Sequence, residues 1–101
     1  MKISLSGHHV EITDGIREAI NNKFSKIQSH YPSLDSLSII LTVEKHEQSV
    51  EAKTQFLGAP VSVQSSHNDM YVAIADAAKK MDSALSHRKG ASGSHRHDKL
   101  S

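Results

Sequence analysis

The chain has 101 residues, of which 37% are hydrophobic, 23% are charged and none is cysteine. This length suits one compact domain, and the absence of cysteine excludes disulfides, thiolate metal sites and cysteine nucleophiles. No apolar stretch resembles a signal-peptide core or could span a bilayer, so we expect a cytoplasmic protein without a membrane partner. The net charge is only +1, but from Lys79 onward six basic residues accompany two acidic ones, a local charge of +4. This asymmetry is a weak indication of a nucleic-acid partner.

The first predicted elements are a strand and a helix. Apolar and polar residues alternate over residues 2–6, the period of a half-buried strand. Thr13 or Asp14 is suited to cap a helix that runs to about His30 and is stopped by Pro32. One apolar stripe follows this helix at spacings of three and four residues and consists of Ile16, Ile20, Phe24 and Ile27.

Three further strands are expected in the middle of the chain. The clearest of them is Leu37–Val43, in which Leu37, Ile39, Leu41 and Val43 alternate with the other residues, and a polar hairpin loop follows at Lys45–Ser49. The inward-facing residues of the next strand are Val50, Ala52, Thr54 and Phe56. Gly58–Pro60 is typical of a tight turn, and Val61 and Val63 mark a short fourth strand.

A second helix closes the predicted domain. Asn68 or Asp69 can cap it, and Gly90 is expected to end it. Its apolar stripe consists of Met70, Ile74, Ala77, Ala78, Met81 and Leu85. Residues 91–101 have almost nothing to bury, so we predict a domain over residues 1–90 and a disordered polar and basic tail over 91–101.

The predicted order β-α-β-β-β-α defines an α+β fold. Alternating strands give a sheet with one dry face, and two one-sided helices must cover that face. A right-handed first crossover makes the first two strands parallel, whereas the later strands pair as antiparallel hairpins. The expected architecture is a two-layer sandwich: a four-stranded mixed sheet with both helices on one face.

No recognisable catalytic motif is present. The chain has no nucleophile elbow, phosphate-binding loop or His-Glu-x-x-His, so we predict that it is not an enzyme and needs no cofactor. His8-His9 and His95-Arg96-His97 invite a metal interpretation, but a zinc site needs about four ligands in one place. We therefore interpret them as exposed loop and tail histidines and predict no metal site.

Basic side chains occur on the flanks of both predicted helices. Lys23, Lys26 and His30 follow one another beside the first apolar stripe, while Lys80 lies on one flank of the last helix and Lys79 on the far side. If the helices pack side by side, these flanks form a discontinuous basic surface. Such a surface contacts phosphates, which supply affinity rather than sequence readout. The alternative is that these are ordinary solvated helix residues.

Three segments resemble the hibernation-promoting factor family. They are H-V-E-I-T-D-G-I-R-E-A-I at His9–Ile20, V-E-K at Val43–Lys45 and H-N-D-M-Y-V-A-I-A-D-A-A-K-K-M at His67–Met81. The resemblance covers about residues 1–89, and Asp-Met-Tyr with the preceding Val-Glu-Ile-Thr is its most specific part. The chain departs from the family in a last helix that is poorer in Lys and Arg, and in the displaced acidic residue Asp76.

The resemblance implies a domain similar to double-stranded RNA-binding domains, whose contacts are mostly to shape and phosphate. It implies binding to small-subunit ribosomal RNA in the decoding channel, where messenger and the A- and P-site transfer RNAs lie. Translation would thus be blocked in stress or stationary phase. The chain resembles the short type of the family, which promotes inactive ribosome dimers with a separate ribosome modulation factor, and we expect a monomer when it is free.

The resemblance also implies which residues contact RNA. The implied RNA contacts are Lys23, Lys26, Tyr71, Lys79, Lys80, Arg88 and Lys89. Two other functions stay open as alternatives: a small metal-binding module built on the histidines, and a protein-binding module that uses the polar face of the sheet.

Overall fold

Four strands and two helices follow one another in the order β-α-β-β-β-α. The structure, a computed structural model, describes residues 1–93, and the side chains of residues 1–90. The elements are β1 (Lys2–His8), α1 (Asp14–His30), β2 (Ser36–Glu44), β3 (Glu47–Phe56), β4 (Ala59–His67) and α2 (Met70–Gly93).

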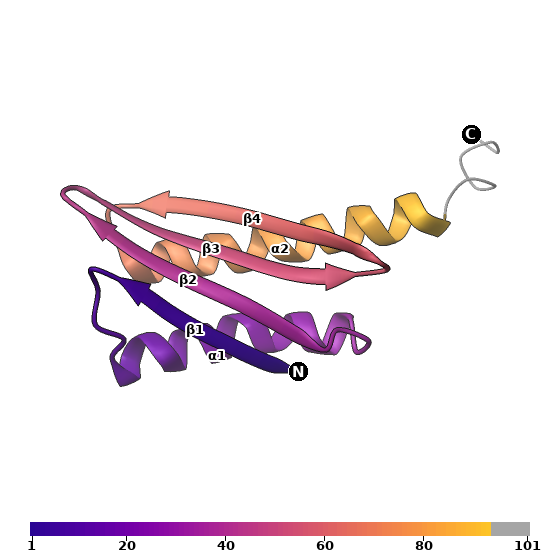
Figure 1. The fold of residues 1–101 in the computed structure, drawn as a ribbon, viewed down its shortest axis with the longest axis horizontal. Coiled ribbons are helices and arrows are strands. Elements are labelled where there is room, and N and C mark those ends of the chain that lie inside the picture. The colour runs from indigo at the N-terminus through magenta and orange to yellow at the C-terminus, as the bar shows by residue number, and fades with distance from the viewer. Residues whose placement is uncertain (94–101) are drawn as a thin grey trace.

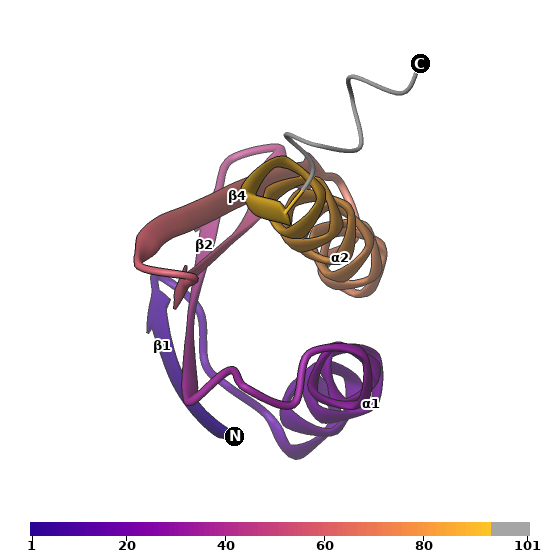
Figure 2. The same cartoon turned by 90° about the vertical axis from the view of Figure 1, so that its right-hand side faces the viewer.

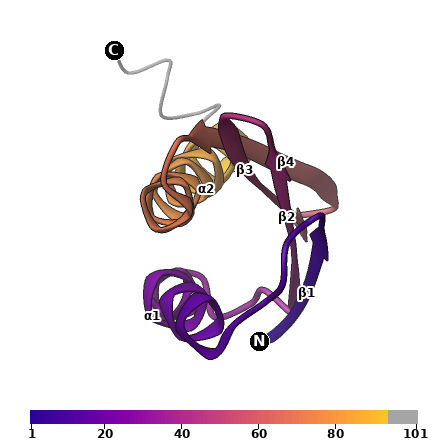
Figure 3. The same ribbon diagram turned by 90° about the vertical axis from the view of Figure 1, so that its left-hand side faces the viewer.

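The sheet has the strand order β1-β2-β3-β4, in which β1 is parallel to β2 and the two later pairs are antiparallel. Both helices lie on the same face of this sheet, as the end-on views in Figure 2 and Figure 3 show. The helices run in the same direction along the sheet (Figure 1). The predicted mixed sheet with two helices on one face is therefore confirmed, including its parallel first pair.

The dry face of the sheet and the apolar stripes of the helices form one core. Ile39 is paired with Leu5 on one side and Ala52 on the other, and it is completely buried. Val43 and Val63, at the margin of the sheet, are only partly buried. Every predicted stripe residue of the helices is buried, namely Ile16, Ile20, Phe24, Ile27, Met70, Ile74, Ala77, Ala78, Met81 and Leu85.

Both helices begin where a side-chain oxygen caps the first turn. The Ile16 amide donates to Thr13 Oγ1 at 3.2 Å, and the Tyr71 amide donates to Asp69 Oδ1 at 2.9 Å. Each bond satisfies one of the amides that a helix start leaves without an intrahelical partner. The sequence predicted both caps as one of two neighbouring residues, and Pro32 follows the end of α1 as expected.

The predicted end of the last helix at Gly90 is wrong, because α2 continues to Gly93. A glycine that ends a helix usually does so by taking a positive φ. Among the glycines of residues 1–93, only Gly58 has a positive φ. An exposed glycine inside a helix costs about 1 kcal/mol relative to alanine, which does not by itself stop the helix. Residues 94–101, most of the predicted tail, lie outside the described residues.

All four strands are longer than predicted, β2 by one residue at each end. β1 continues to His8, β4 continues to His67, and β3 already begins at Glu47 inside the predicted loop. The end of β4 was missed because its inward residue there is Ser65, which is 1% exposed. The hydrophobic alternation therefore stops at Val63 although the pairing with β3 continues.

The turn between β3 and β4 is formed by Leu57 and Gly58, whose φ angles are 53° and 79°. Two successive positive φ values match the twist of the flanking strands, and glycine adopts them without steric strain. Ala59 and Pro60, which the sequence assigned to the turn, belong to β4. Pro60 is tolerated there because β4 is an edge strand.

Replacing Phe24 by alanine tests the core. Phe24 is 0% exposed, so we expect the free energy of unfolding to fall by about 3–5 kcal/mol. Urea denaturation followed by circular dichroism measures this loss. The exposed Ser25→Ala variant is the control and should stay within about 0.5 kcal/mol of the parent. A loss below about 1 kcal/mol for Phe24→Ala contradicts the core described here.

Candidate nucleic-acid interface

A groove of about 210 Å³ lies between α1 and α2. The side chains that line it come from these two helices alone: Lys23, Lys26, Ile27, Ala75, Ala78, Lys79 and Asp82. Three of the predicted RNA-contact lysines thus meet in one place although they are up to 56 positions apart in sequence. The local charge of this groove is positive.

The lysines line the groove because each is next to a core residue in the sequence. Lys23 precedes Phe24 and Lys79 follows Ala78, so each side chain emerges about one residue's rotation away from the packed face of its helix. Ala75 and Ala78 are small, which leaves space between the two helices at this point. Both lysines are exposed, and their ammonium groups can therefore reach a polyanion.

Tyr71 lies near one end of the interface between the helices. A Cβ atom added at Gly15, in the first turn of α1, would lie 2.8 Å from the Tyr71 hydroxyl oxygen. A larger residue at position 15 would therefore displace the Tyr71 hydroxyl from its present position. Tyr71 is 51% exposed, which leaves part of the residue free for a contact with a partner.

A polar cluster joins the helices at the C-terminal end of α1. His30 Nδ1 lies 3.2 Å from Asp82 Oδ2, and the Tyr31 hydroxyl donates to the Asp82 carbonyl at 3.3 Å. Burial raises the pKa of Tyr31, so its phenol stays protonated and continues to donate. The sequence placed His30 on the same flank as Lys23 and Lys26, but nothing in it signalled the contact with Asp82.

Lys80 and Arg88 do not line the groove. Lys80 Nζ donates to the Gln64 carbonyl of β4 at 3.0 Å, and Arg88 Nη2 donates to the Leu57 carbonyl of the β3–β4 turn at 3.0 Å. Both side chains therefore attach α2 to the β4 side of the sheet. Lys89 is exposed and follows Arg88 directly. Of the seven predicted contacts, three therefore line the groove, and Lys80 and Arg88 contact β4 and its turn instead.

Lys80 also belongs to a cluster around Asp76. Asp76 Oδ2 accepts from the Ser65 hydroxyl at 2.7 Å and lies 3.5 Å from Lys80 Nζ and 3.6 Å from His67 Nε2. The Ser65 hydrogen bond is the main cause that lowers the pKa of Asp76, and the positive charge of Lys80 adds to it. Asp76 therefore satisfies a buried serine and tethers α2 to β4, a structural role that the sequence did not reveal.

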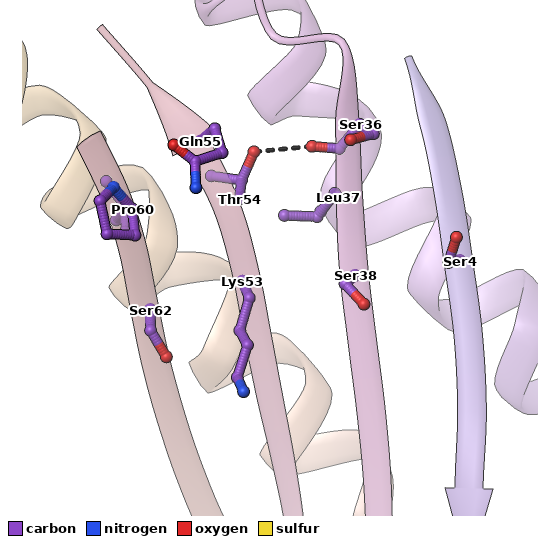
Figure 4. Close-up of a pocket in the computed structure, with 10 residues that line it drawn as sticks. Ser4, Ser36, Leu37, Ser38, Lys53, Thr54, Gln55, Pro60 and Ser62 are labelled. Atoms are coloured by element: carbon purple, nitrogen blue, oxygen red, sulfur yellow. Dashed lines mark hydrogen bonds between the residues drawn. The ribbon is translucent and has the colours of Figure 1, made fainter. Parts of the chain in front are cut away.

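The outer face of the sheet carries a second, more open hollow of about 290 Å³, drawn in Figure 4. The register places Lys53 between Ser38 and Ser62 in this hollow, and Ser4 lies one strand beyond Ser38 in the same row. Lys53 supplies the positive charge of this hollow, and Glu51 Oε1 lies 3.8 Å from its ammonium group. Since a nearby carboxylate offsets the one lysine, this face is a weaker phosphate site than the groove between the helices.

The described residues support neither a metal site nor a membrane-spanning helix. Among residues 1–93, no group of three or more His, Cys, Asp or Glu side chains could hold a metal ion. His9 lies in the β1–α1 loop with a φ of 61°, and His95 and His97 lie outside the described residues. No helix in this part of the chain has the length and hydropathy to cross a bilayer.

Fold and groove together are those of a small α+β binding domain. The family model described as "Sigma 54 modulation protein / S30EA ribosomal protein" matches residues 3–92, and the chain belongs to this family. The family consists of ribosome-associated factors that are not enzymes, which agrees with the predicted absence of catalysis. The resemblance seen in the sequence is confirmed.

Curated relatives and solved structures agree with this family assignment. A "Ribosome hibernation promoting factor" of Azotobacter vinelandii is 38% identical over 85 residues, which cover 84% of this chain and 79% of the relative. One from Pseudomonas putida strain KT2440 is 37% identical over 89 residues, covering 88% and 87%. The structure of a ribosomal subunit interface protein from Coxiella burnetii is similar with a TM-score of 0.84 and 27% identity, covering 89% of this chain and 99% of that one.

The Asp76 cluster predicts a pH-dependent contribution to stability. Asp76→Asn should lower the free energy of unfolding at pH 7 by about 1–2 kcal/mol, because it removes the negative charge that accepts the Ser65 hydrogen bond and pairs with Lys80. The folded state lowers the pKa of Asp76 below its ordinary 3.8. Its contribution is therefore fully present above that value and is lost as the pH falls through the lowered one.

Urea denaturation of the parent and of Asp76→Asn from pH 7 down to acid pH measures this contribution as the difference between the two. Asp35→Asn, an exchange at an exposed position before β2, is the matched control. Its free energy of unfolding should differ less from that of the parent than the Asp76→Asn value does. A gap between parent and Asp76→Asn that stays constant down to acid pH contradicts the assignment.

Proposed function

We propose that this chain is a ribosome hibernation factor that binds the small ribosomal subunit through the groove between α1 and α2. The observation that carries the proposal is the convergence of Lys23, Lys26 and Lys79 on one groove, in a chain of a ribosomal protein family. Relatives named ribosome hibernation promoting factors share 37–38% identity with it over most of their length. Ribosomal RNA supplies the phosphates that such a groove fits.

The proposed binding site is the channel of messenger and of the A- and P-site transfer RNAs. A rigid domain lodged in that channel stops translation by occupancy, so one protein inactivates one ribosome and no turnover is needed. We propose that this occurs in the cytoplasm in stress or stationary phase. We also propose that the bound ribosomes form inactive dimers with the help of a ribosome modulation factor.

Lys79, Lys23 and Lys26 supply the central contacts in this proposal, and Tyr71 lies near the same interface. Lys80, Arg88 and Lys89 extend the positive charge along α2. Because Lys80 and Arg88 already donate to backbone carbonyls, they have fewer free donors for a phosphate. We therefore expect them to contribute less affinity than the groove lysines.

The decisive experiment is ribosome pelleting of a Lys23→Ala/Lys26→Ala/Lys79→Ala variant over a range of salt concentrations. Exposed helix residues change stability little, so circular dichroism should show a folded protein. We expect weaker binding and a salt dependence that is flatter by about two to three units of slope, since each lost phosphate contact removes about one.

The matched control removes the same charge elsewhere. Lys2, Lys45 and Lys53 are exposed on β1, on the β2–β3 turn and on β3, and their triple alanine variant should pellet like the parent. Excess messenger or initiator transfer RNA should displace the parent protein. Equal pelleting of the groove variant and the parent at every salt concentration rules out the groove as the contact surface.

A further inference from the structure

Asp82 places a negative charge in a groove that is otherwise lined by lysines. Its side chain is 36% exposed, and it lines the groove together with Lys23, Lys26 and Lys79. Asp82 follows Lys79 by three positions, which puts both on the same side of α2. A carboxylate at this position weakens the binding of phosphate in the groove, so the presence of Asp82 needs another explanation.

Two contacts from α1 and the residue after it hold Asp82 in position. His30 Nδ1 lies 3.2 Å from Oδ2, and the buried Tyr31 hydroxyl donates to the main-chain carbonyl of Asp82 at 3.3 Å. Tyr31 is itself packed edge-on against Phe56 of the core, with ring centroids 5.5 Å apart. The backbone at Asp82 is therefore tied to the core, and its carboxylate is oriented by His30.

The carboxylate still has accepting capacity after this contact. An ionised carboxylate has about four lone-pair sites and no donor, and the contact with His30 uses one of them. A phosphate oxygen, which also only accepts, is repelled at this position. A hydroxyl or amino group is attracted there, because it can donate to the carboxylate.

We propose that Asp82 is a specificity-determining acceptor for a ribose 2′-hydroxyl, and that His30 is its positioning residue. This inference rests on the proposed function, in which the lysines of the same groove hold the phosphates of RNA. A strand whose phosphates lie on Lys23, Lys26 and Lys79 brings its sugar edge near Asp82. RNA presents a donor on every ribose and DNA presents none, so the groove selects RNA.

The test compares three single-stranded probes of one sequence: RNA, 2′-O-methyl RNA and DNA. The 2′-O-methyl probe keeps the RNA bases and phosphates but loses the hydroxyl donor. Fluorescence anisotropy at fixed salt should show the parent binding RNA about tenfold more tightly than either other probe, the effect of one hydrogen bond to a charged group. This comparison needs no variant.

Variants then assign the discrimination to Asp82. Asp82→Ala removes the acceptor and the repulsion, so its affinities for the three probes should converge, with DNA binding becoming tighter. Asp35→Ala makes the same change of charge at an exposed position outside the groove and should keep the parent's ratio. His30→Ala should lower the ratio of the affinity for RNA to the affinity for DNA. His30→Gln, which keeps a donor, should restore part of this ratio.

Two results overturn the inference: a parent that binds all three probes equally or not at all, and an Asp82→Ala variant, folded by circular dichroism, that keeps the parent's ratio. Ribosome pelleting of the parent is independent of these results. If the parent pellets with ribosomes but shows no discrimination between probes, the proposed function stands and the role of Asp82 fails. If it neither pellets nor binds a probe, both fail.

Discussion

The packing of two one-sided helices on one dry face of a sheet is the constraint on which the rest of the structure depends. Each helix has a single apolar stripe, and the sheet has a single apolar face, so neither layer can be buried without the other. Both helices must therefore share that face and lie side by side (Figure 2). Their flanks then meet, and the lysines on these flanks line a common groove. The candidate site is a consequence of how the core is buried.

The elements could be predicted from the sequence because their signals are local. Stripes such as Ile16 to Ile27 and Met70 to Leu85 recur at helical spacing, and every member proved to be buried. Predictions failed where a local signal was absent or ambiguous. Ser65 occupies an inward position without being apolar, because Asp76 satisfies its hydroxyl from another element. Gly90 is compatible with a helix as well as with its end.

The candidate site was only partly predictable, for a reason that Lys79 and Lys80 illustrate. These neighbours differ by about 100° around the helix axis, so one lines the groove and the other donates to Gln64 of β4. A sequence shows that both are basic, but only the packing of α2 shows which side each one occupies. The contact between His30 and Asp82 likewise becomes visible only in the packed structure, since 52 positions separate its partners.

The modest charge of the chain constrains how it can hold a ribosome. A net charge of +1 provides little long-range attraction to a polyanion, so affinity must come from short-range contacts at well-placed groups. The contacts of α2 with β4 serve this requirement. Asp76, Lys80 and Arg88 tie the helix to the sheet and its turn, and they fix the side of α2 that carries Lys79 and Asp82. The basic residues that do not face the groove thus set the geometry of those that do, and a rigid groove loses less entropy on binding than a flexible one.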